Sequence, residues 1–158
     1  MKRVVITGMG INSCIGNSLE EVTNSLQNGI SGTRFNPTYA DMNFKSHVSA
    51  AAEQDFDHID RKLKRFMGVC AMYAYNSALA AVQHAGLQPE DIGGNPRYGI
   101  AGGSGGGSTA SVIEMKELLD TKGARKVGPF FVPRNMSNTI SANVGVALKL
   151  QGVAHTIT

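Results

Sequence analysis

Few side chains in this sequence could act as a nucleophile, a general base or a metal ligand. Cys14 lies in an expected turn and could be reactive, but no basic residue flanks it to favour the thiolate. Cys70 falls in an apolar pattern that is typical of a helix core. No two histidines stand at a metal-binding spacing; they are His47, His58, His84 and His155. The residue types therefore predict neither a complete catalytic constellation nor a metal site in this chain.

Two glycine motifs could bind phosphate groups. Gly8-Met9-Gly10 resembles the start of a dinucleotide fingerprint, but Ser13 replaces the third glycine and no acidic residue ends a second strand about 20 positions later. Residues 102–108 contain five glycines, but they lack the Gly-Lys-Ser/Thr ending of a phosphate-binding loop. A structural turn is the better interpretation of both motifs, and a nucleotide-binding oxidoreductase stays an alternative function.

Basic residues form two clusters in a chain whose overall charge is only +3. This balance is too mild to indicate nucleic-acid binding. One cluster contains Arg61, Lys62, Lys64 and Arg65, and the other contains Lys122, Arg125 and Lys126. Either cluster could be a solvated helix face, or it could steer an acidic partner toward the protein.

An alternation of strands and helices positions the longer glycine run. Residues 98–101 predict a buried strand and residues 109–119 a helix, so the glycines turn the chain at the carboxyl edge of a sheet, where α/β proteins bind ligands. Further strands are expected at residues 4–6, 47–50 and 153–158. Further helices are expected at residues 18–28, from Asp57 or Asp60 to about His84, and at residues 134–149. The first of these should be capped by Asn17 or Ser18 and end at Gly29 in a left-handed conformation, and Lys122 to Pro133 is expected as a loop. This order predicts an α/β protein.

Length and composition indicate one globular domain, or part of one. The 158 residues are 42% hydrophobic and 17% charged. Two distant cysteines outside any redox motif favour a reduced, cytoplasmic protein. No signal peptide or apolar run of transmembrane length is present, so no membrane association is expected. The last expected strand has no turn after it, and we therefore expect the first part of a longer protein.

Four motifs occur together in a fixed order. They are RVVITGMG at residues 3–10, IDRK at 59–62, GSGGGS at 103–108 and the strand that begins with Gly152-Val153. As a set, they resemble the amino-terminal part of bacterial β-ketoacyl-acyl carrier protein synthases, most closely type I. The stretch from Pro129 to Pro133 looks more like the type II enzymes. The resemblance covers essentially the whole chain.

The resemblance implies a thiolase-like fold of α-β-α-β-α layers built from two related halves, with residues 1–158 in the amino-terminal half. Family members condense an acyl chain held on a cysteine with a malonyl group on acyl carrier protein and release carbon dioxide. That cysteine follows the strand that matches residues 153–158, and two histidines and a lysine come later. We therefore expect that this chain ends before its nucleophile, needs no cofactor and cannot condense substrates alone.

The resemblance also assigns two groups of binding residues. Gly106 matches the position of a gating side chain beside the acyl chain, and Phe131 and Met136, with Asn135 next to them, match the far end of a dimer partner's acyl pocket. Ordinary interface packing is the alternative role for Phe131, Asn135 and Met136. Positions that face the acidic carrier protein in the family correspond to Arg61, Lys62, Arg65, Lys122 and Arg125. A homodimer is expected for the intact protein.

A second function shares this fold without catalysis. Chain-length factors resemble the synthases through this half but lack the nucleophilic cysteine, so a partner subunit of this type is the main alternative. Residues after Thr158 would separate the two.

Overall fold

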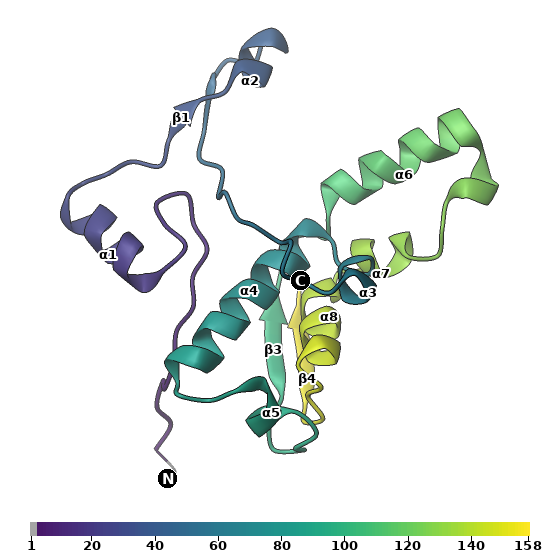
Figure 1. Cartoon of the computed structure of the whole chain (residues 1–158). Coiled ribbons are helices and arrows are strands. Elements are labelled where there is room, and N and C mark those ends of the chain that lie inside the picture. Colours follow the sequence, from purple (N-terminus) through teal and green to yellow (C-terminus); the bar gives the residue numbers. More distant parts are fainter. Residues whose placement is uncertain (1–2) are drawn as a thin grey trace.

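A two-stranded parallel sheet and two helices form the centre of the molecule. In the computed structural model, which describes residues 3–158, β3 (Ile100–Gly103) pairs with β4 (Ala154–Ile157). α8 (Thr139–Ala147) contacts both strands and also packs against α4 (Val69–His84) (Figure 1). Parallel strands need a long connection, and α6 (Thr109–Lys122), α7 (Phe131–Asn135) and α8 provide it. The expected strand–helix–strand order is confirmed here.

The main apolar core lies where α8 meets α4 and the sheet. Val144 and Leu148 are buried together with Ile92 of α5 (Pro89–Ile92), and Ala78 and Val82 of α4 pack against them. The alanines of α4 allow α8 to approach closely because they add little side-chain volume. This core fixes the sheet relative to the helices, and with it the turn that follows β3.

Residues 3–12 run beside α4 as extended chain and do not form the strand that we expected at residues 4–6. The side chains of Val4, Val5 and Ile6 are 92%, 65% and 83% exposed. A strand needs a neighbour to pair its backbone groups, and no strand of residues 3–158 pairs with this segment. The expectation was wrong because the pairing partner, not the apolar pattern, decides whether a strand forms.

Gly8 and Gly10 bring this segment into contact with the backbone of α4. A Cβ atom on Gly8 would lie 2.1 Å from the Ala81 carbonyl oxygen, and one on Gly10 would lie 2.0 Å from the Ser77 carbonyl oxygen. The Met9 amide also donates a hydrogen bond of 3.0 Å to Nδ1 of His84. The two glycines therefore serve close helix packing, and not a nucleotide site or the tight strand-to-helix turn that the sequence suggested.

An arm of short elements follows. The Ser18 hydroxyl caps α1 (Leu19–Gln27) by accepting from the Glu21 amide at 3.1 Å, as predicted. Gly29, with a φ of 62°, ends that helix in the expected left-handed conformation. β1 (Arg34–Phe35) and β2 (Val48–Ser49) pair antiparallel on either side of α2 (Pro37–Asp41). Figure 1 shows this arm projecting from the central helices.

The long helix expected up to His84 is two helices. Asp60 caps α3 (Arg61–Lys64), and α4 begins only after Gly68. A Cβ atom on Gly68 would lie 2.6 Å from the Ser108 Cβ and 2.9 Å from the Arg134 carbonyl oxygen. The chain breaks here because its backbone packs against two other segments, which a continuous helix with side chains would not allow.

The helix expected at residues 134–149 is also divided. α7 ends at Asn135, the backbone of Met136 is extended, and α8 starts at Thr139. Thr139 is fully buried, and its carbonyl accepts a 2.8 Å hydrogen bond from the Asn143 side chain. The region expected as a loop before Pro133 contains a 3-10 helix, η1 (Ala124–Lys126), and the first part of α7.

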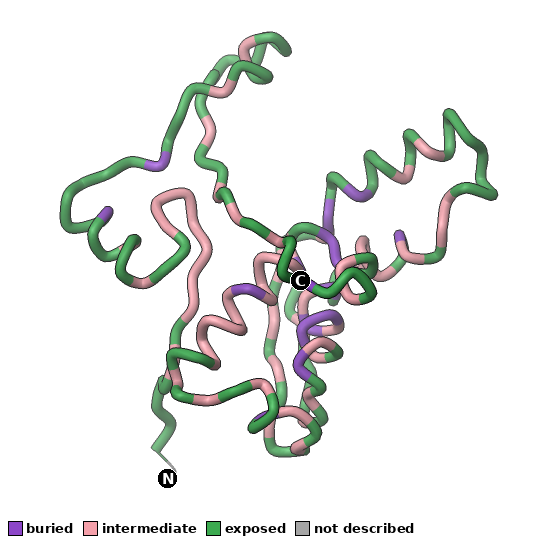
Figure 2. The backbone as a smooth tube through the Cα atoms, in the orientation of Figure 1, coloured by how far each residue is buried: buried purple, intermediate pink, exposed green. Residues whose placement is uncertain are grey.

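Much of the molecular surface is uncovered. The accessible surface is 10999 Å², whereas a compact monomer of this length exposes about 7,600 Å². Exposed segments dominate α1, the β1–β2 arm and α6 (Figure 2). Within residues 3–158, no helix is both long and apolar enough to cross a membrane. The exposed apolar side chains, which include Val4, Ile6 and Ile157, are of the kind that further protein segments usually cover.

Candidate functional site

The glycine loop lies at the carboxyl edge of the β3–β4 sheet, where the sequence placed it. The Ser104 amide donates a 3.2 Å hydrogen bond to the carbonyl of Ile157 at the end of β4. The Ser104 hydroxyl bonds the Gly106 carbonyl and so closes the loop on itself. Ser108 ends the loop and caps α6 by accepting from the Ser111 amide. The loop is therefore held at both ends, with its middle free of side chains.

α7 packs directly against this loop. A Cβ atom on Gly107 would lie 2.7 Å from the Asn135 carbonyl oxygen, so only glycine fits. Asn135 donates a 2.9 Å hydrogen bond to the Phe131 carbonyl, and its Oδ1 atom is buried without a hydrogen-bond partner among residues 3–158. Phe131 is buried and Met136 is half-buried. Three of the four predicted acyl-pocket residues thus lie in one segment beside the loop.

Gly106 stands apart from that contact. A Cβ atom at Gly106, or at Gly105, would meet no atom within 4 Å. The structure therefore joins the loop to α7 through Gly107 and leaves the Gly106 position open. A larger side chain at Gly106 could enter free space without disturbing the loop.

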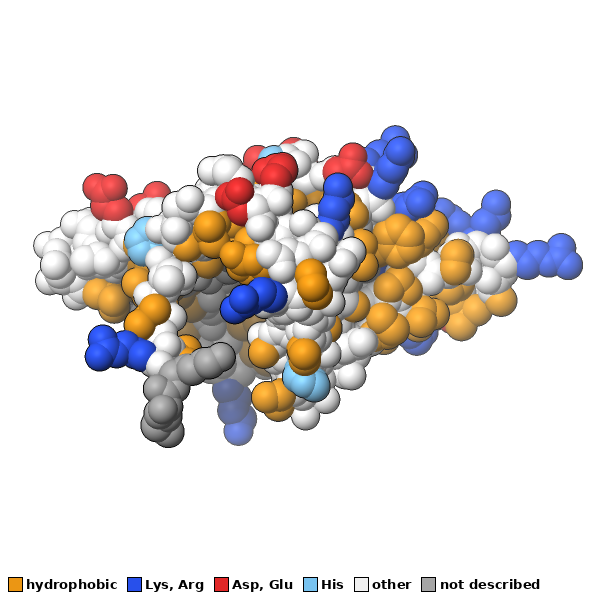
Figure 3. Space-filling view, turned by 90° about the horizontal axis from the view of Figure 1, so that it is seen from below, with side chains coloured by type: hydrophobic (Ala, Val, Ile, Leu, Met, Phe, Trp, Pro, Cys, Tyr) orange, Lys and Arg blue, Asp and Glu red, His pale blue; other side chains and the backbone are white. Residues whose placement is uncertain are grey.

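The predicted carrier-facing residues are exposed. Arg61 and Lys62 belong to α3 and Arg65 follows it, while Lys122 ends α6 and Arg125 lies in η1. Within residues 3–158, the ion pairs do not include any of these five side chains. Figure 3 shows Lys and Arg side chains gathered toward the end of the molecule that carries α6 and η1. Their charge is therefore available to an acidic partner.

An aromatic cluster connects α3 to α7. The rings of Phe66 and Phe130 meet edge to face at 4.9 Å, and the Arg65 guanidinium lies 4.6 Å from the Phe130 ring centroid. Arg134 reaches across from α7 to the Arg65 carbonyl at 3.0 Å. Sequence reasoning missed Arg134, because a single arginine after an apolar run carries no signal of its partners.

The other reactive side chains do not form a catalytic group. Burial raises the pKa of the Cys70 thiol, which disfavours its reactive thiolate at neutral pH. The Cys14 sulfur packs against Gly32, and His58 hydrogen-bonds Asn76 at 2.9 Å. His155 is exposed on β4. Among residues 3–158, no cluster of histidine, cysteine or carboxylate side chains could hold a metal ion.

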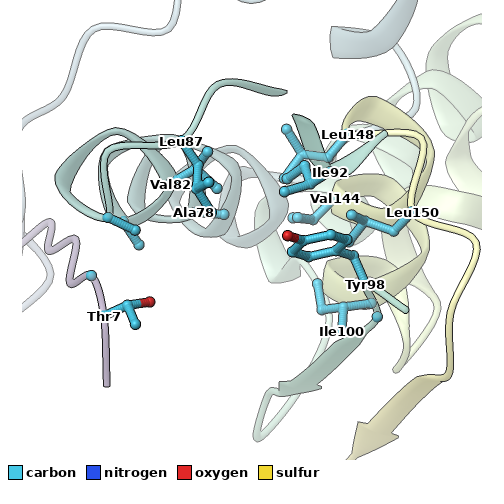
Figure 4. Close-up of a pocket in the computed structure, with 14 residues that line it drawn as sticks. Thr7, Ala78, Val82, Leu87, Ile92, Tyr98, Ile100, Val144, Leu148 and Leu150 are labelled. Atoms are coloured by element: carbon cyan, nitrogen blue, oxygen red, sulfur yellow. The ribbon is translucent and has the colours of Figure 1, made fainter. Parts of the chain in front are cut away.

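A separate apolar cavity of about 300 Å³ opens between residues 7–8, α4, α5, β3 and α8. In Figure 4, Thr7 lies on one side of it, and Tyr98 and Ile100 lie on the other. None of the predicted acyl-pocket residues lines this cavity. It adjoins the unpaired segment at residues 3–8 and is distinct from the glycine-loop site.

The molecule has a parallel strand pair with a helical crossover, covering helices and a glycine turn at the carboxyl edge of the sheet. This arrangement belongs to the thiolase-like layered fold. The chain belongs to the β-ketoacyl synthase family, because the family described as "Beta-ketoacyl synthase, N-terminal domain" matches residues 1–158.

Individual relatives agree with this assignment. The chain is 41% identical over 159 residues to 3-oxoacyl-(acyl-carrier-protein) synthase 1 of Escherichia coli K12, which covers 99% of this chain and 39% of that protein. The crystal structure of a β-ketoacyl synthase from Burkholderia phymatum STM815 superposes with a TM-score of 0.83 at 28% identity, over 98% of this chain and 39% of that one. The ishigamide ketosynthase/chain length factor gives a TM-score of 0.78 at 26% identity, over 99% and 40%. The chain thus spans about two fifths of the length of these relatives.

Proposed function

We propose that this chain is the amino-terminal part of a 3-oxoacyl-acyl carrier protein synthase that lengthens fatty acyl chains. The observation that carries the proposal is the 41% identity to a synthase of that name across 99% of this chain. In the proposed reaction, a cysteine thiolate attacks the acyl thioester and displaces the carrier thiolate. Malonyl carrier then loses carbon dioxide, and its enolate attacks the acyl-enzyme carbonyl as the cysteine sulfur leaves with the bonding electron pair.

Residues 1–158 would supply binding surfaces rather than the nucleophile. The cysteine is expected soon after β4, where the carboxyl edge of the sheet meets the glycine loop through the Ser104–Ile157 hydrogen bond. The loop and α7 would therefore lie beside the reacting thioester. Gly106 would leave room for the acyl chain, and Phe131, Asn135 and Met136 would form the wall that the loop packs against or that a dimer partner receives.

The exposed arginines and lysines of the two clusters would bind the carrier protein. Support comes from the exposure of the five side chains named below, none of which has an ion-pair partner within residues 3–158. Exposed basic groups without ion-pair partners attract an acidic protein and accelerate its association. The set is Arg61, Lys62, Arg65, Lys122 and Arg125.

Product analysis of the intact protein tests the proposed reaction. The protein is incubated with acyl carrier protein bearing an acyl chain and with the malonyl-loaded carrier. We expect a 3-oxoacyl carrier that is longer by one two-carbon unit, with one carbon dioxide released per product. Residues 1–158 alone serve as the control and should form none. An intact protein that makes no such product would disprove the synthase assignment, and condensation by the isolated chain would disprove the missing-nucleophile expectation.

A non-catalytic partner subunit is the second candidate, because the fold also matches the ishigamide ketosynthase/chain length factor. The residue that follows β4 in the intact protein separates the two functions. A cysteine that is alkylated at that position, with loss of condensation, supports the synthase. Any other residue there supports the chain-length subunit.

We also propose a cytoplasmic homodimer for the intact protein. Two distant cysteines outside redox motifs fit a reducing compartment. The large uncovered surface and the exposed apolar residues of β4 fit coverage by further chain and by a second subunit. Sedimentation analysis of the intact protein would report the subunit number.

A further inference from the structure

Arg134 joins three elements that are far apart in sequence. Its Nε atom donates to the Arg65 carbonyl at 3.0 Å, and its Nη1 atom lies 3.3 Å from Oε2 of Glu114 on α6. The guanidinium also lies over the Phe131 ring, 5.2 Å from its centroid. Only 22% of the Arg134 side chain is exposed, against 55% for Glu114. Arg134 thus contacts the end of α3, the middle of α6 and the start of its own helix.

Arg65, whose carbonyl accepts the hydrogen bond from Arg134, itself packs on aromatic rings. The Arg65 guanidinium lies 4.6 Å from the Phe130 centroid and 5.1 Å from the Phe66 centroid. Cation–π contacts of this kind stabilise the position of an arginine side chain on the ring face. Arg65 is therefore fixed to α7 twice, through its carbonyl by Arg134 and through its side chain by Phe130.

These contacts join the basic surface of α3 to the apolar segment of α7. A shift of the backbone after α3 moves the Arg65 carbonyl, and the guanidinium of Arg134 must follow it or lose the hydrogen bond. The same guanidinium covers Phe131, whose neighbour Asn135 packs against the glycine loop. A lysine could not replace Arg134 in these contacts. Its single Nζ ammonium would have to reach the Arg65 carbonyl, the Glu114 carboxylate and the Phe131 ring face at once, whereas the guanidinium reaches them with different atoms.

We propose that Arg134 is a positioning residue that couples carrier docking on α3 to the acyl-binding segment at Phe131–Asn135. The proposal rests on the function proposed above, and it predicts that carrier binding influences which acyl chains are accepted. A purely structural Arg134 would lower stability without altering that preference.

The test compares acyl preference on two kinds of substrate in the intact protein. The ratio of kcat/KM for long and short acyl groups is measured on the carrier protein and on the small thiol N-acetylcysteamine. Coupling predicts that the ratio measured on the carrier differs from the ratio measured on N-acetylcysteamine in the wild type. Arg134→Gln should bring the ratio on the carrier closer to the ratio on N-acetylcysteamine by about threefold to tenfold. Arg134→Lys should behave like Arg134→Gln, because it keeps the charge but not the contacts.

Two further variants keep the test interpretable. Glu114→Gln removes the ion pair but leaves the contacts of Arg134 with Arg65 and Phe131, and it should narrow the difference less. Lys116→Gln is the matched control, since it removes an ion pair with Asp120 on the same helix and should have no effect on the ratio. If Arg134→Gln does not fold, an Arg134→Lys variant that keeps the wild-type difference would overturn the proposal.

The outcomes separate this proposal from the proposed function. A wild type that makes no condensation product refutes the synthase assignment. An active wild type with equal ratios on both substrates, or an active Arg134→Gln variant that keeps the wild-type difference, refutes only the coupling.

Discussion

Neighbouring glycines in the loop after β3 have different physical roles. Gly107 must lack a side chain, because a Cβ atom would lie 2.7 Å from the backbone oxygen of Asn135. Gly105 and Gly106 face open space, and neither has a φ in the left-handed region. The absence of a side chain at position 106 therefore leaves the space beside the loop empty, and it is not required by the backbone conformation of a turn. The sequence located the loop but could not separate these roles, since they depend on where α7 packs.

Substitution of Gly106 tests whether that empty volume holds the acyl chain. In the intact enzyme, Gly106→Met should lower kcat/KM for long acyl chains by about tenfold or more relative to short ones, because the side chain would occupy the space. The measurement is a series of acyl lengths on the carrier protein. Gly105→Met is the matched control, and an unchanged preference in Gly106→Met would exclude the pocket role.

The exposed charges on α3 are testable one at a time. Arg61→Glu and Lys62→Glu should each raise the KM for carrier protein by about threefold to tenfold at low salt and flatten its salt dependence. Lys45→Glu makes the same charge change in the β1–β2 arm and should have little effect. Equal effects at Lys45 and Arg61 would mean that overall charge, and not a docking surface, governs the KM.

At the scale of whole elements, local signals predicted the helix starts better than the helix lengths. The Ser18 cap and the Gly29 end follow from short-range chemistry, and both are confirmed. The breaks at Gly68 and after Asn135 come from contacts with Ser108 and with the loop, which no local pattern records. The expected strand at residues 4–6 failed for the same reason, because its partner is not local.

The contact between residues 3–12 and α4 gives a prediction for stability. Gly8→Ala would place a Cβ atom 2.1 Å from the Ala81 carbonyl oxygen, so the segment or the helix must shift. We expect the free energy of unfolding of the intact protein to fall by about 1–3 kcal/mol. Chemical denaturation measures it.

Gly105→Ala is the control for that experiment. Its Cβ atom would meet nothing within 4 Å, and the change in unfolding free energy should stay within about 0.5 kcal/mol. A Gly8→Ala variant as stable as Gly105→Ala would show that the segment does not pack on α4 in the intact protein.

At the scale of the whole molecule, family and fold were predictable, whereas the binding residues stay predictions. Four motifs in order identified the family, and the family match covers residues 1–158. The roles of Gly106, Phe131 and Arg61 stay predictions, because a bound acyl chain or carrier protein defines such sites. The large uncovered surface fits the family resemblance, which places further segments of the fold against these residues.

That uncovered surface predicts how residues 1–158 behave when isolated. An accessible area of 10999 Å², against about 7,600 Å² for a compact monomer, leaves apolar groups such as Val4, Ile6 and Val153 in water. The isolated chain should therefore bind the dye ANS strongly and elute as a mixture of associated species, because association removes this apolar surface from solvent. The intact protein should bind little dye and elute as one species. A monodisperse isolated chain that binds no dye and unfolds cooperatively would mean that residues 1–158 bury their own apolar surface in solution.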